Sequence, residues 1–270
     1  MMVNAADNGA DKVLELLKKH SKILYPDLIL PRQSEVAAAA NADFDAAGQP
    51  VSWQSFPLLQ RMRGSLNFLW GRLLLQGVEE KADIAFYGCS ENVGNTFVSF
   101  HLAAFVAMSN GLKTIYVDTD CDAHPDNSHP IGKTDLPGLL AYYYEGASLE
   151  DCIHPTRIPG LYVMPSGRKV PGRPGNSIPP TGKIKKLVES LRERFQLVIY
   201  DCQSVLVKPI EITFAQYARN VILVSRYATS RREICEQTLE SFKANKIEVT
   251  GVVLNQREYP IPKKIYDLLK

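Results

Sequence analysis

The chain has 270 residues, which suits one α/β domain with additional terminal segments and is enough to bury a sizeable core. Its formal net charge is +2 and its charged residues, 22% of the total, are spread along the sequence, so no nucleic-acid partner is expected. The five cysteines show no CxxC spacing and no secretory leader begins the chain, which predicts a cytoplasmic protein, and no apolar run approaches the roughly 18 residues that cross a bilayer.

The first fifty residues predict a segment apart from the main domain. Apolar residues recur near helical spacing close to the start and predict a short amphipathic helix. Between about Leu30 and Val51 the chain is rich in Ala, Asn and Asp, which is typical of a linker. We therefore divide the chain into an N-terminal helix and flexible linker, residues 1–50, and one domain, residues 51–270. The apolar positions of the helix are Val13, Leu14, Leu16, Leu17 and Ile23.

Short apolar runs alternate with helical patterns through the rest of the chain, after a leucine-rich helix expected over residues 53–76. Apolar strands separated by helices indicate a mainly parallel sheet covered on both faces, so the predicted fold is a three-layer α/β/α sandwich. Ligands of such sheets bind at the carboxyl ends of the strands. The expected strands are ADIAFY, LKTIYVD, GLYVMP, QLVIYD, NVILVS and VTGVVLN, and the expected helices cover residues 95–109, 135–145, 181–195, 210–219 and 230–245.

The first of these strands ends in GCSENVGNT, residues 88–96, which runs directly into a helical pattern. Gly88 and Gly94 allow the chain to turn close to an anion, and the amides of a helix N-terminus suit a phosphate. The Thr96 hydroxyl stands where a P-loop Ser or Thr holds magnesium, but the lysine position holds Asn95. Such a turn without its lysine is more often only a turn, so the stretch needs support from other strand ends.

Two further strands end in carboxylates. VDTDCD carries Asp118 and Asp120, and YDCQS carries Asp201. Aspartate at a strand end is also common as a helix N-cap. Three strand ends that meet at one edge of a sheet, with glycine, threonine and carboxylates in this order, nevertheless predict the ancestry of a magnesium–phosphate site.

From about Phe56 to the C-terminus the sequence resembles the bacterial tyrosine kinases of capsule and exopolysaccharide export, which belong to the MinD/ParA-type P-loop ATPases. The runs GCSENVGNT, DTDCD and DCQ follow the order of that family's GxxxGxGK[ST], DxDxR and D[ST]P motifs. The segment LPGLLAYYYEGASLEDCIHPT is similar to its GL..LL.G..SLEDAIHPT segment. The resemblance implies a P-loop NTPase fold of the MinD/ParA-like kind.

The resemblance also implies roles for the strand-end residues, with ATP and magnesium as cofactors if the site is active. Thr96 and Asp120 would hold magnesium, Asp118 would act as a base or orient the metal, and Asp201 would be the Walker B carboxylate. The positions that would line the phosphates are Gly88, Ser90, Asn92, Gly94, Asn95 and Thr96.

Several positions depart from the family pattern, and two of the changes at the strand ends remove positive charge. Asn95 replaces the Walker lysine, and Asp122 replaces the arginine of DxDxR. The helix that carries ExxRxxR for ring assembly in the family keeps only Arg63 of that motif, and the C-terminal tyrosine cluster is missing. The other departures are Asn92 for a glycine, Cys202 and Gln203 for the residues after the Walker B aspartate, and isolated Tyr259 and Tyr266 in the tail.

We therefore predict a degenerate, pseudokinase-like protein of exopolysaccharide or capsule synthesis and export. It is expected in the cytoplasm, peripheral to the inner membrane and held there by a chain-length-determining membrane protein (a polysaccharide co-polymerase). Assembly as a homo-oligomer is an open alternative. One alternative is an active tyrosine kinase or ATPase with a deviant Walker A loop, and another is a MinD/ParA-like positioning ATPase. The polysaccharide, the oligomeric state and the use of ATP are left open.

Cysteines follow the same three strand ends: Cys89, Cys121 and Cys202. Three thiolates at one edge of a sheet raise the alternative of a soft-metal or redox site. Cysteine is also a common small buried residue, and none of the three shows tight ligand spacing. A metal or redox role is therefore a minor alternative.

Overall fold

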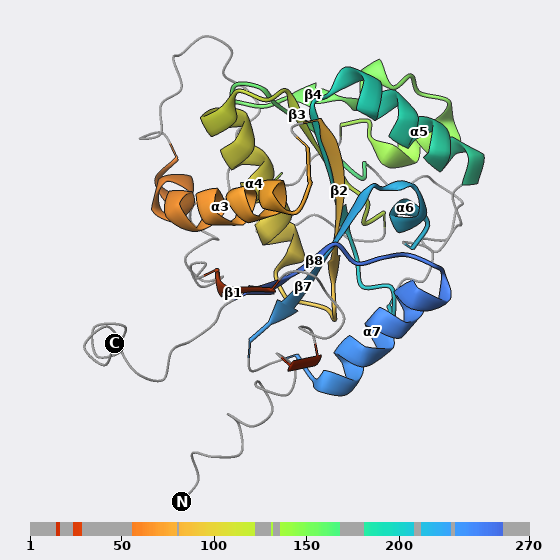
Figure 1. Cartoon of the computed structure of the whole chain (residues 1–270). Helices are drawn as coiled ribbons and strands as arrows, with labels where there is room; N and C mark the ends of the chain where they lie inside the picture. The colour runs from red at the N-terminus through yellow and green to blue at the C-terminus, as the bar shows by residue number, and fades with distance from the viewer. Residues whose placement is uncertain are drawn as a thin grey trace, which may run out of the picture.

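The computed structural model describes residues 15–16, 24–28, 56–79, 81–121, 131, 136–167, 181–207, 212–227 and 230–255. Their strands form one sheet of eight with the order β1-β8-β7-β2-β6-β3-β5-β4 (Figure 1). Neighbouring strands are parallel apart from the short antiparallel pair of β4 with β5. The predicted fold class, a mainly parallel sheet between helical layers, is confirmed.

The element bounds agree with the pattern expected from the sequence, and all six expected strands are present. The expected helix at 135–145 contains a π-helical turn, Ala141–Glu145. The strands are β1 Leu24–Leu28, β2 Ala82–Gly88, β3 Thr114–Asp118, β4 His154–Pro155, β5 Leu161–Met164, β6 Leu197–Cys202, β7 Asn220–Arg226 and β8 Gly251–Asn255. The helices are α3 Pro57–Leu75, α4 Asn95–Asn110, α5 Thr181–Arg194, α6 Ile212–Tyr217 and α7 Arg232–Ala244, with a 3-10 turn at Glu150–Cys152.

Strand β1 was not expected, because it lies within the first fifty residues. It extends the sheet beyond β8, with Leu24 opposite Val252. Nearer the start, Leu16 is 8% exposed and belongs to the same apolar core as residues of α7. The expected N-terminal helix is described only at Glu15 and Leu16, both helical. The domain division at residue 50 stays a prediction.

Two apolar cores lie on opposite faces of the sheet, since successive side chains of a strand point to opposite sides. In β2, Ile84 and Phe86 belong to the core beneath α3 and α4, whereas Ala85 and Tyr87 belong to the core beneath α5, α6 and α7. Figure 1 shows these two helical layers on either side of the strands. The central strand is thus fixed on both faces, which gives its carboxyl end a defined position.

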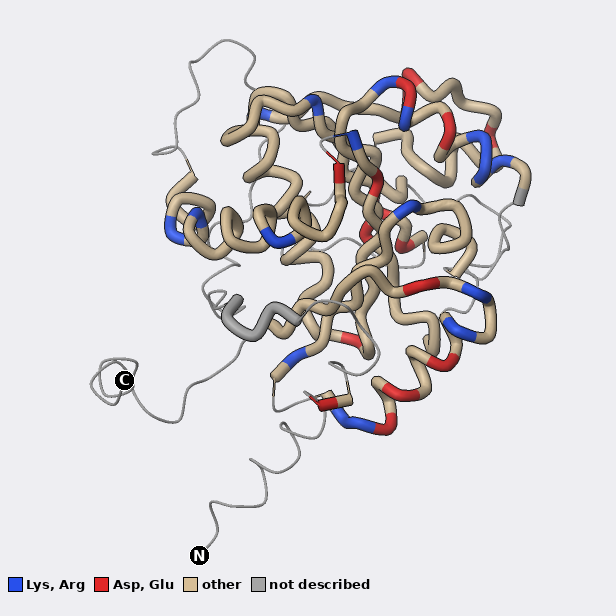
Figure 2. The backbone as a smooth tube through the Cα atoms, in the orientation of Figure 1, with Lys and Arg blue, Asp and Glu red and all other residues tan. Residues whose placement is uncertain are grey.

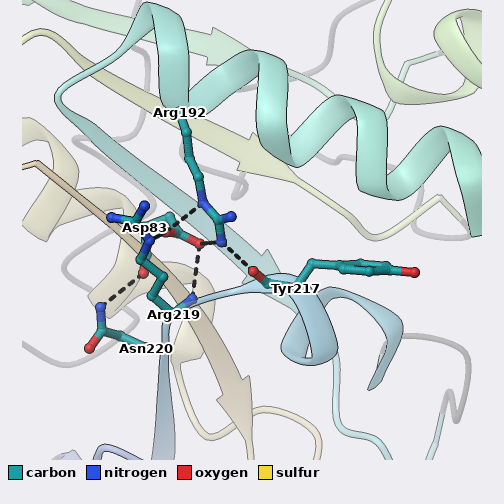
Figure 3. A network of polar contacts seen from close by, with 5 residues as sticks. All are labelled: Asp83, Arg192, Tyr217, Arg219 and Asn220. Carbon is teal, nitrogen blue, oxygen red and sulfur yellow. Dashed lines mark hydrogen bonds and ion pairs between the residues drawn. The ribbon is translucent and has the colours of Figure 1, made fainter.

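A buried ion pair fixes the opposite, amino-terminal end of β2 (Figure 3). Asp83 is fully buried, and Arg192 of α5 donates to its two carboxylate oxygens at 2.9 and 2.8 Å. Arg192 also donates to the main-chain oxygen of Tyr217. The N–H of Arg219 donates to Asp83 at 3.1 Å, and the Asn220 amide donates to its main-chain oxygen at 3.2 Å. This network joins α5, α6 and β7 to β2.

Charge is mixed over most of the described surface. Figure 2 shows acidic and basic residues interspersed along α5 and α7, in keeping with the small net charge. Helix α3 differs, because its charged residues are Arg61, Arg63 and Arg72 and it contains no acidic residue. Among the described helices, none combines the length and the hydropathy that a membrane crossing needs.

Candidate functional site: a P-loop whose asparagine is bonded inward

The loop between β2 and α4 lies at the centre of the sheet, because β2 pairs with β6 on one side and β7 on the other. Gly88 ends β2 and α4 begins at Asn95. A Cβ atom at Gly88 would lie 2.7 Å from the main-chain oxygen of Ser90 and 2.9 Å from a methyl group of Val93. Glycine is therefore required where the loop folds back on itself.

The second half of the loop has two residues with positive φ. Gly94 has φ +88°, and a Cβ there would collide with the side-chain amide nitrogen of Asn255. Asn92 has φ +57°, a left-handed conformation that asparagine tolerates better than most residues. Asn92 therefore preserves the main-chain shape at a position where the resemblance implies glycine.

Asn255, the last residue of β8, holds this part of the loop. Its Nδ2 donates to the main-chain oxygen of Val93 at 2.8 Å, and the residue is 2% exposed. The sequence analysis did not select Asn255 as a site residue. The available signal was a polar residue at the end of an otherwise apolar strand, on the same edge of the sheet as the loop.

The side chain of Asn95 is bonded toward β6. Its Nδ2 donates to Oδ1 of Asp201 at 3.0 Å and to the main-chain oxygen of Cys202 at 2.9 Å. An asparagine amide has two N–H donors, and both are used by these bonds. Asn95 is 7% exposed and Asp201 is 1% exposed, so the contact is shielded from water. The residue in the lysine position thus links the loop to the Walker B strand.

The second oxygen of Asp201 also has a donor inside the fold. The Tyr116 hydroxyl of β3 donates to Oδ2 at 2.8 Å. Burial, together with the charges of Asp201 and Asp118, raises the pKa of Tyr116 well above its usual value, so this hydroxyl stays protonated. Tyr116 is another residue that the sequence analysis missed, because a tyrosine inside an apolar strand is indistinguishable from core.

The third strand end, that of β3, lies beside the end of β6. Asp118 of β3 pairs in register with Asp201 of β6. Its Oδ1 accepts the N–H of Asp120 at 3.0 Å, and its Oδ2 accepts the N–H of Ser166 at 3.4 Å. The Thr119 hydroxyl donates to the main-chain oxygen of Asp201 at 2.8 Å. The structure therefore brings together the ends of β2, β6 and β3.

The roles of the remaining candidate site residues stay predictions. Ser90 and Thr96 are half-buried in the loop and at the start of α4, and Asp120 is half-buried after β3. Asp122, which replaces the family's arginine, lies outside the described residues. In the part of the chain that is described, no group of three His, Cys, Asp or Glu side chains could hold a metal ion, so the soft-metal alternative gains no support.

The site fits a phosphate in shape but not in charge. The loop keeps the glycines, and Thr96 stands at the start of α4. Residues 87–97 contain no lysine or arginine, and they include the exposed carboxylate of Glu91. A nucleoside triphosphate with magnesium needs positive charge near its β- and γ-phosphates. The side chains of residues 87–97, all of them described, do not supply it, so we derive no catalytic step through ATP from this loop.

Comparison with known proteins gave no match to any family model. The tyrosine-protein kinase ptk of Acinetobacter johnsonii is 32% identical over 173 residues, 64% of this chain and 23% of that protein. The tyrosine-protein kinase wzc of Salmonella typhimurium is 28% identical, with 78% of this chain and 28% of that protein covered. CpsD of Streptococcus agalactiae is 26% identical, with 70% of this chain and 80% of that protein covered. The chain thus spans less than a third of ptk and wzc.

Solved structures show the same fold. The chimerical protein CapA2B2 has a TM-score of 0.65 at 20% identity and covers 93% of this chain and 100% of its own. The kinase domain of Escherichia coli tyrosine kinase ETK has a TM-score of 0.64 at 17% identity, with coverage of 91% and 96%. MinD of Pyrococcus horikoshii, complexed with Mg-ADP, has a TM-score of 0.54 at 20% identity, with coverage of 70% and 76%.

The sheet, the loop at its centre and these neighbours define a P-loop NTPase fold of the MinD type. By sequence, the chain is a homologue of the bacterial tyrosine-protein kinases. The resemblance to these kinases that the sequence motifs predicted is therefore confirmed.

Proposed function

We propose that this chain is a pseudokinase: a regulatory or scaffolding protein of exopolysaccharide or capsule synthesis that neither needs nor hydrolyses ATP. The observation that carries the proposal is the inward bonding of Asn95. Both of its amide donors are used by Asp201 and Cys202, so its side chain cannot serve a phosphate without breaking two buried hydrogen bonds. The homology to tyrosine kinases supports a role in polysaccharide synthesis. The replacement of the P-loop lysine by Asn95 argues against phosphoryl transfer from ATP.

The expected loss of nucleotide affinity follows from the strength of the hydrogen bond that a lysine at position 95 would make to a phosphate. A charge-assisted hydrogen bond contributes about 1.5–3 kcal/mol, against about 1 kcal/mol for a neutral one. The absence of lysine therefore weakens nucleotide binding by about tenfold or more, and breaking the two bonds of Asn95 adds to this. A transition state that gathers charge on the transferred phosphate loses more than the ground state.

Calorimetric titration with ATP and magnesium tests the proposal directly. We expect no binding heat for the wild-type protein up to millimolar ATP, and no phosphate release. Asn95→Lys restores the cation and should gain measurable affinity, while Asn95→Gln, which remains neutral, is the matched control and should not. Micromolar binding by the wild type that is lost in Thr96→Ala would overturn the pseudokinase proposal.

An active tyrosine kinase or ATPase is the second candidate, and the preserved loop favours it. The positive φ of Asn92 and Gly94 and the position of Thr96 keep the main-chain shape that phosphates need. This candidate predicts incorporation of labelled phosphate from ATP into a protein tyrosine. Loss of that incorporation in Asp118→Asn would identify the activity as the chain's own.

The proposed partner is a polysaccharide co-polymerase in the inner membrane, with this chain on its cytoplasmic side. Helix α3 offers a surface for such contact, because Phe68 and Leu75 are 47% and 76% exposed beside the basic Arg72. Apolar side chains at this exposure are typical of binding surfaces when they gather on one helix. The protein should sediment with membranes only in cells that make the co-polymerase.

A double variant, Phe68→Ser with Leu75→Ser, should release the protein into the soluble fraction. Val207→Ser, which changes another exposed apolar residue, is the matched control and should leave the distribution unchanged. Equal sedimentation in cells with and without the co-polymerase would contradict the proposed partner.

A further inference from the structure

Cys89, the residue that follows β2, packs against helix α7. Its main-chain oxygen accepts a hydrogen bond from the Thr238 hydroxyl at 3.1 Å, and its N–H donates to the main-chain oxygen of Val224 at 2.8 Å. Cys235 lies three residues before Thr238, so both side chains lie on the same face of α7. Cys89 and Cys235 are fully buried and belong to the same core. These contacts place Cys89 against the turn of α7 that carries Cys235.

Ser225 follows Val224, the partner of the Cys89 N–H, and its hydroxyl lies 3.9 Å from the Cys235 sulfur, so β7 also places the two cysteines side by side. The neighbouring Cys235 side chain, followed by burial, raises the pKa of Cys89 well above its usual value, and the Cys89 side chain lowers the pKa of Cys235. The Ser225 hydroxyl, 3.9 Å from the sulfur of Cys235, lowers that pKa as well. Cys235 is therefore the sulfur that ionises first, with Cys89 as its protonated neighbour.

We propose that Cys89 and Cys235 form a disulfide when the protein meets hydrogen peroxide, and that this bond joins the base of the P-loop to α7. The sequence grouped Cys89 with Cys121 and Cys202, but the structure pairs it with a cysteine on another element. The proposal does not depend on whether the protein binds nucleotide.

The reaction is a two-electron oxidation of the pair. The Cys235 thiolate attacks one oxygen of the peroxide, the O–O bond breaks, and the hydroxide that leaves takes up the proton Cys235 released, to give water. The resulting sulfenic acid is then attacked by the Cys89 sulfur, an S–S bond forms, and the departing hydroxide takes the Cys89 proton as a second water. Two thiols and one peroxide thus give one disulfide and two waters.

Burial sets the condition under which the pair reacts. Because both sulfurs are shielded, hydrogen peroxide reaches them through local opening of the structure. Cys121 is half-buried and is reached without opening, whereas Cys152 is buried with its pKa raised to about 11 and should react more slowly than either. Oxidation of Cys121 therefore shows that the peroxide treatment was effective, and Cys152 is the matched buried control.

The test is a disulfide map of the full chain. Reduced protein is treated with hydrogen peroxide under native conditions, alkylated with iodoacetamide and digested with trypsin. Cys89 lies in the tryptic peptide of residues 82–113 and Cys235 in that of residues 233–243. We expect these two peptides to be recovered as one disulfide-linked species that dithiothreitol separates. The oxidised protein should melt about 5 °C or more above the reduced protein, because the bond closes a long loop.

Single variants separate this pair from the other thiols. Cys89→Ser and Cys235→Ser should each abolish the linked species and the rise in melting temperature, while Cys152→Ser should retain both. If a variant at either paired position fails to fold, the wild-type peptide map still decides. Recovery of both peptides in alkylated form while Cys121 is oxidised, or a link that forms only in the urea-unfolded chain, would overturn the proposal.

Discussion

Replacing Asn95 with alanine removes the contact that joins the P-loop to β6. The change leaves Oδ1 of Asp201 and the main-chain oxygen of Cys202 without their amide donor in a site that is nearly closed to water. A hydrogen bond to a charged group contributes about 1.5–3 kcal/mol, and one to a carbonyl contributes about 1 kcal/mol. We therefore expect Asn95→Ala to lower the free energy of unfolding by about 3 kcal/mol.

Urea unfolding followed by circular dichroism measures this loss of free energy. In a thermal scan of a chain of this size, about 3 kcal/mol corresponds to a fall in melting temperature of roughly 6–12 °C. The neighbouring Thr96→Ala is the matched control, because it removes a half-buried hydroxyl at the same helix start and should change stability by less than about 0.5 kcal/mol. If Asn95→Ala and Thr96→Ala lose equally little, the inward bonding of Asn95 is not a structural contact.

Tyr116→Phe tests whether the two donors share one carboxylate. Asn95 and Tyr116 bind different oxygens of Asp201, so their losses should not add, and a double-mutant cycle should give a coupling of about 0.5–3 kcal/mol. Asn95→Asp has nearly the same shape but places a second carboxylate beside Asp201. It should be more destabilising than alanine at neutral pH and should recover as the pH falls, because the added carboxyl can then be protonated.

Other predictions concern buried groups away from the loop. Burial lowers the pKa of His101 to about 4, so as the pH falls the unfolded chain binds a proton at this histidine before the folded chain does. The free energy of unfolding, measured with urea, should therefore fall by about 2 kcal/mol between pH 7 and pH 4.5. His101→Gln should remove that part of the fall. Arg192→Met leaves the Asp83 carboxylate without its guanidinium and should cost about 3 kcal/mol by the same measurement, while Asp83→Asn in the same chain should recover part of it. Gly94→Ala should cost about 2 kcal/mol because of its positive φ and the nearby Asn255 amide, a loss that Asn255→Ala would reduce.

Much of the sheet could be predicted from the sequence because its strands are apolar throughout and helices separate them. Strand β1 could not, since LYPDL contains Pro26, and proline is tolerated at a sheet edge where its missing N–H faces no partner strand. Strand β4 has only His154 and Pro155, too short for any pattern. Edge strands depend on the neighbour that they meet, which a local pattern does not contain.

The candidate site, like the sheet, could be predicted from the sequence only in part. Gly88, Asp118 and Asp201 could be placed together because carboxyl ends of parallel strands share an edge. The direction of the Asn95 side chain could not be predicted, since it depends on acceptors far along the chain. The resemblance placed Asn95 among the residues that would line the phosphates, whereas in the structure both of its amide donors are bonded to β6.

The main chain of the loop has a consequence for how such a protein can change over time. Asn92 already adopts the left-handed backbone of a glycine, and Gly94 keeps its own positive φ, so the turn does not need refolding when a neighbouring side chain is exchanged. Under the proposed function, affinity for a nucleotide can then be lost or regained by mutation at Asn95 without a change in the main-chain shape of the loop. On this proposal, the loss of nucleotide binding can be reversed during evolution. The loop is also a starting point from which an engineered ATP switch needs few substitutions.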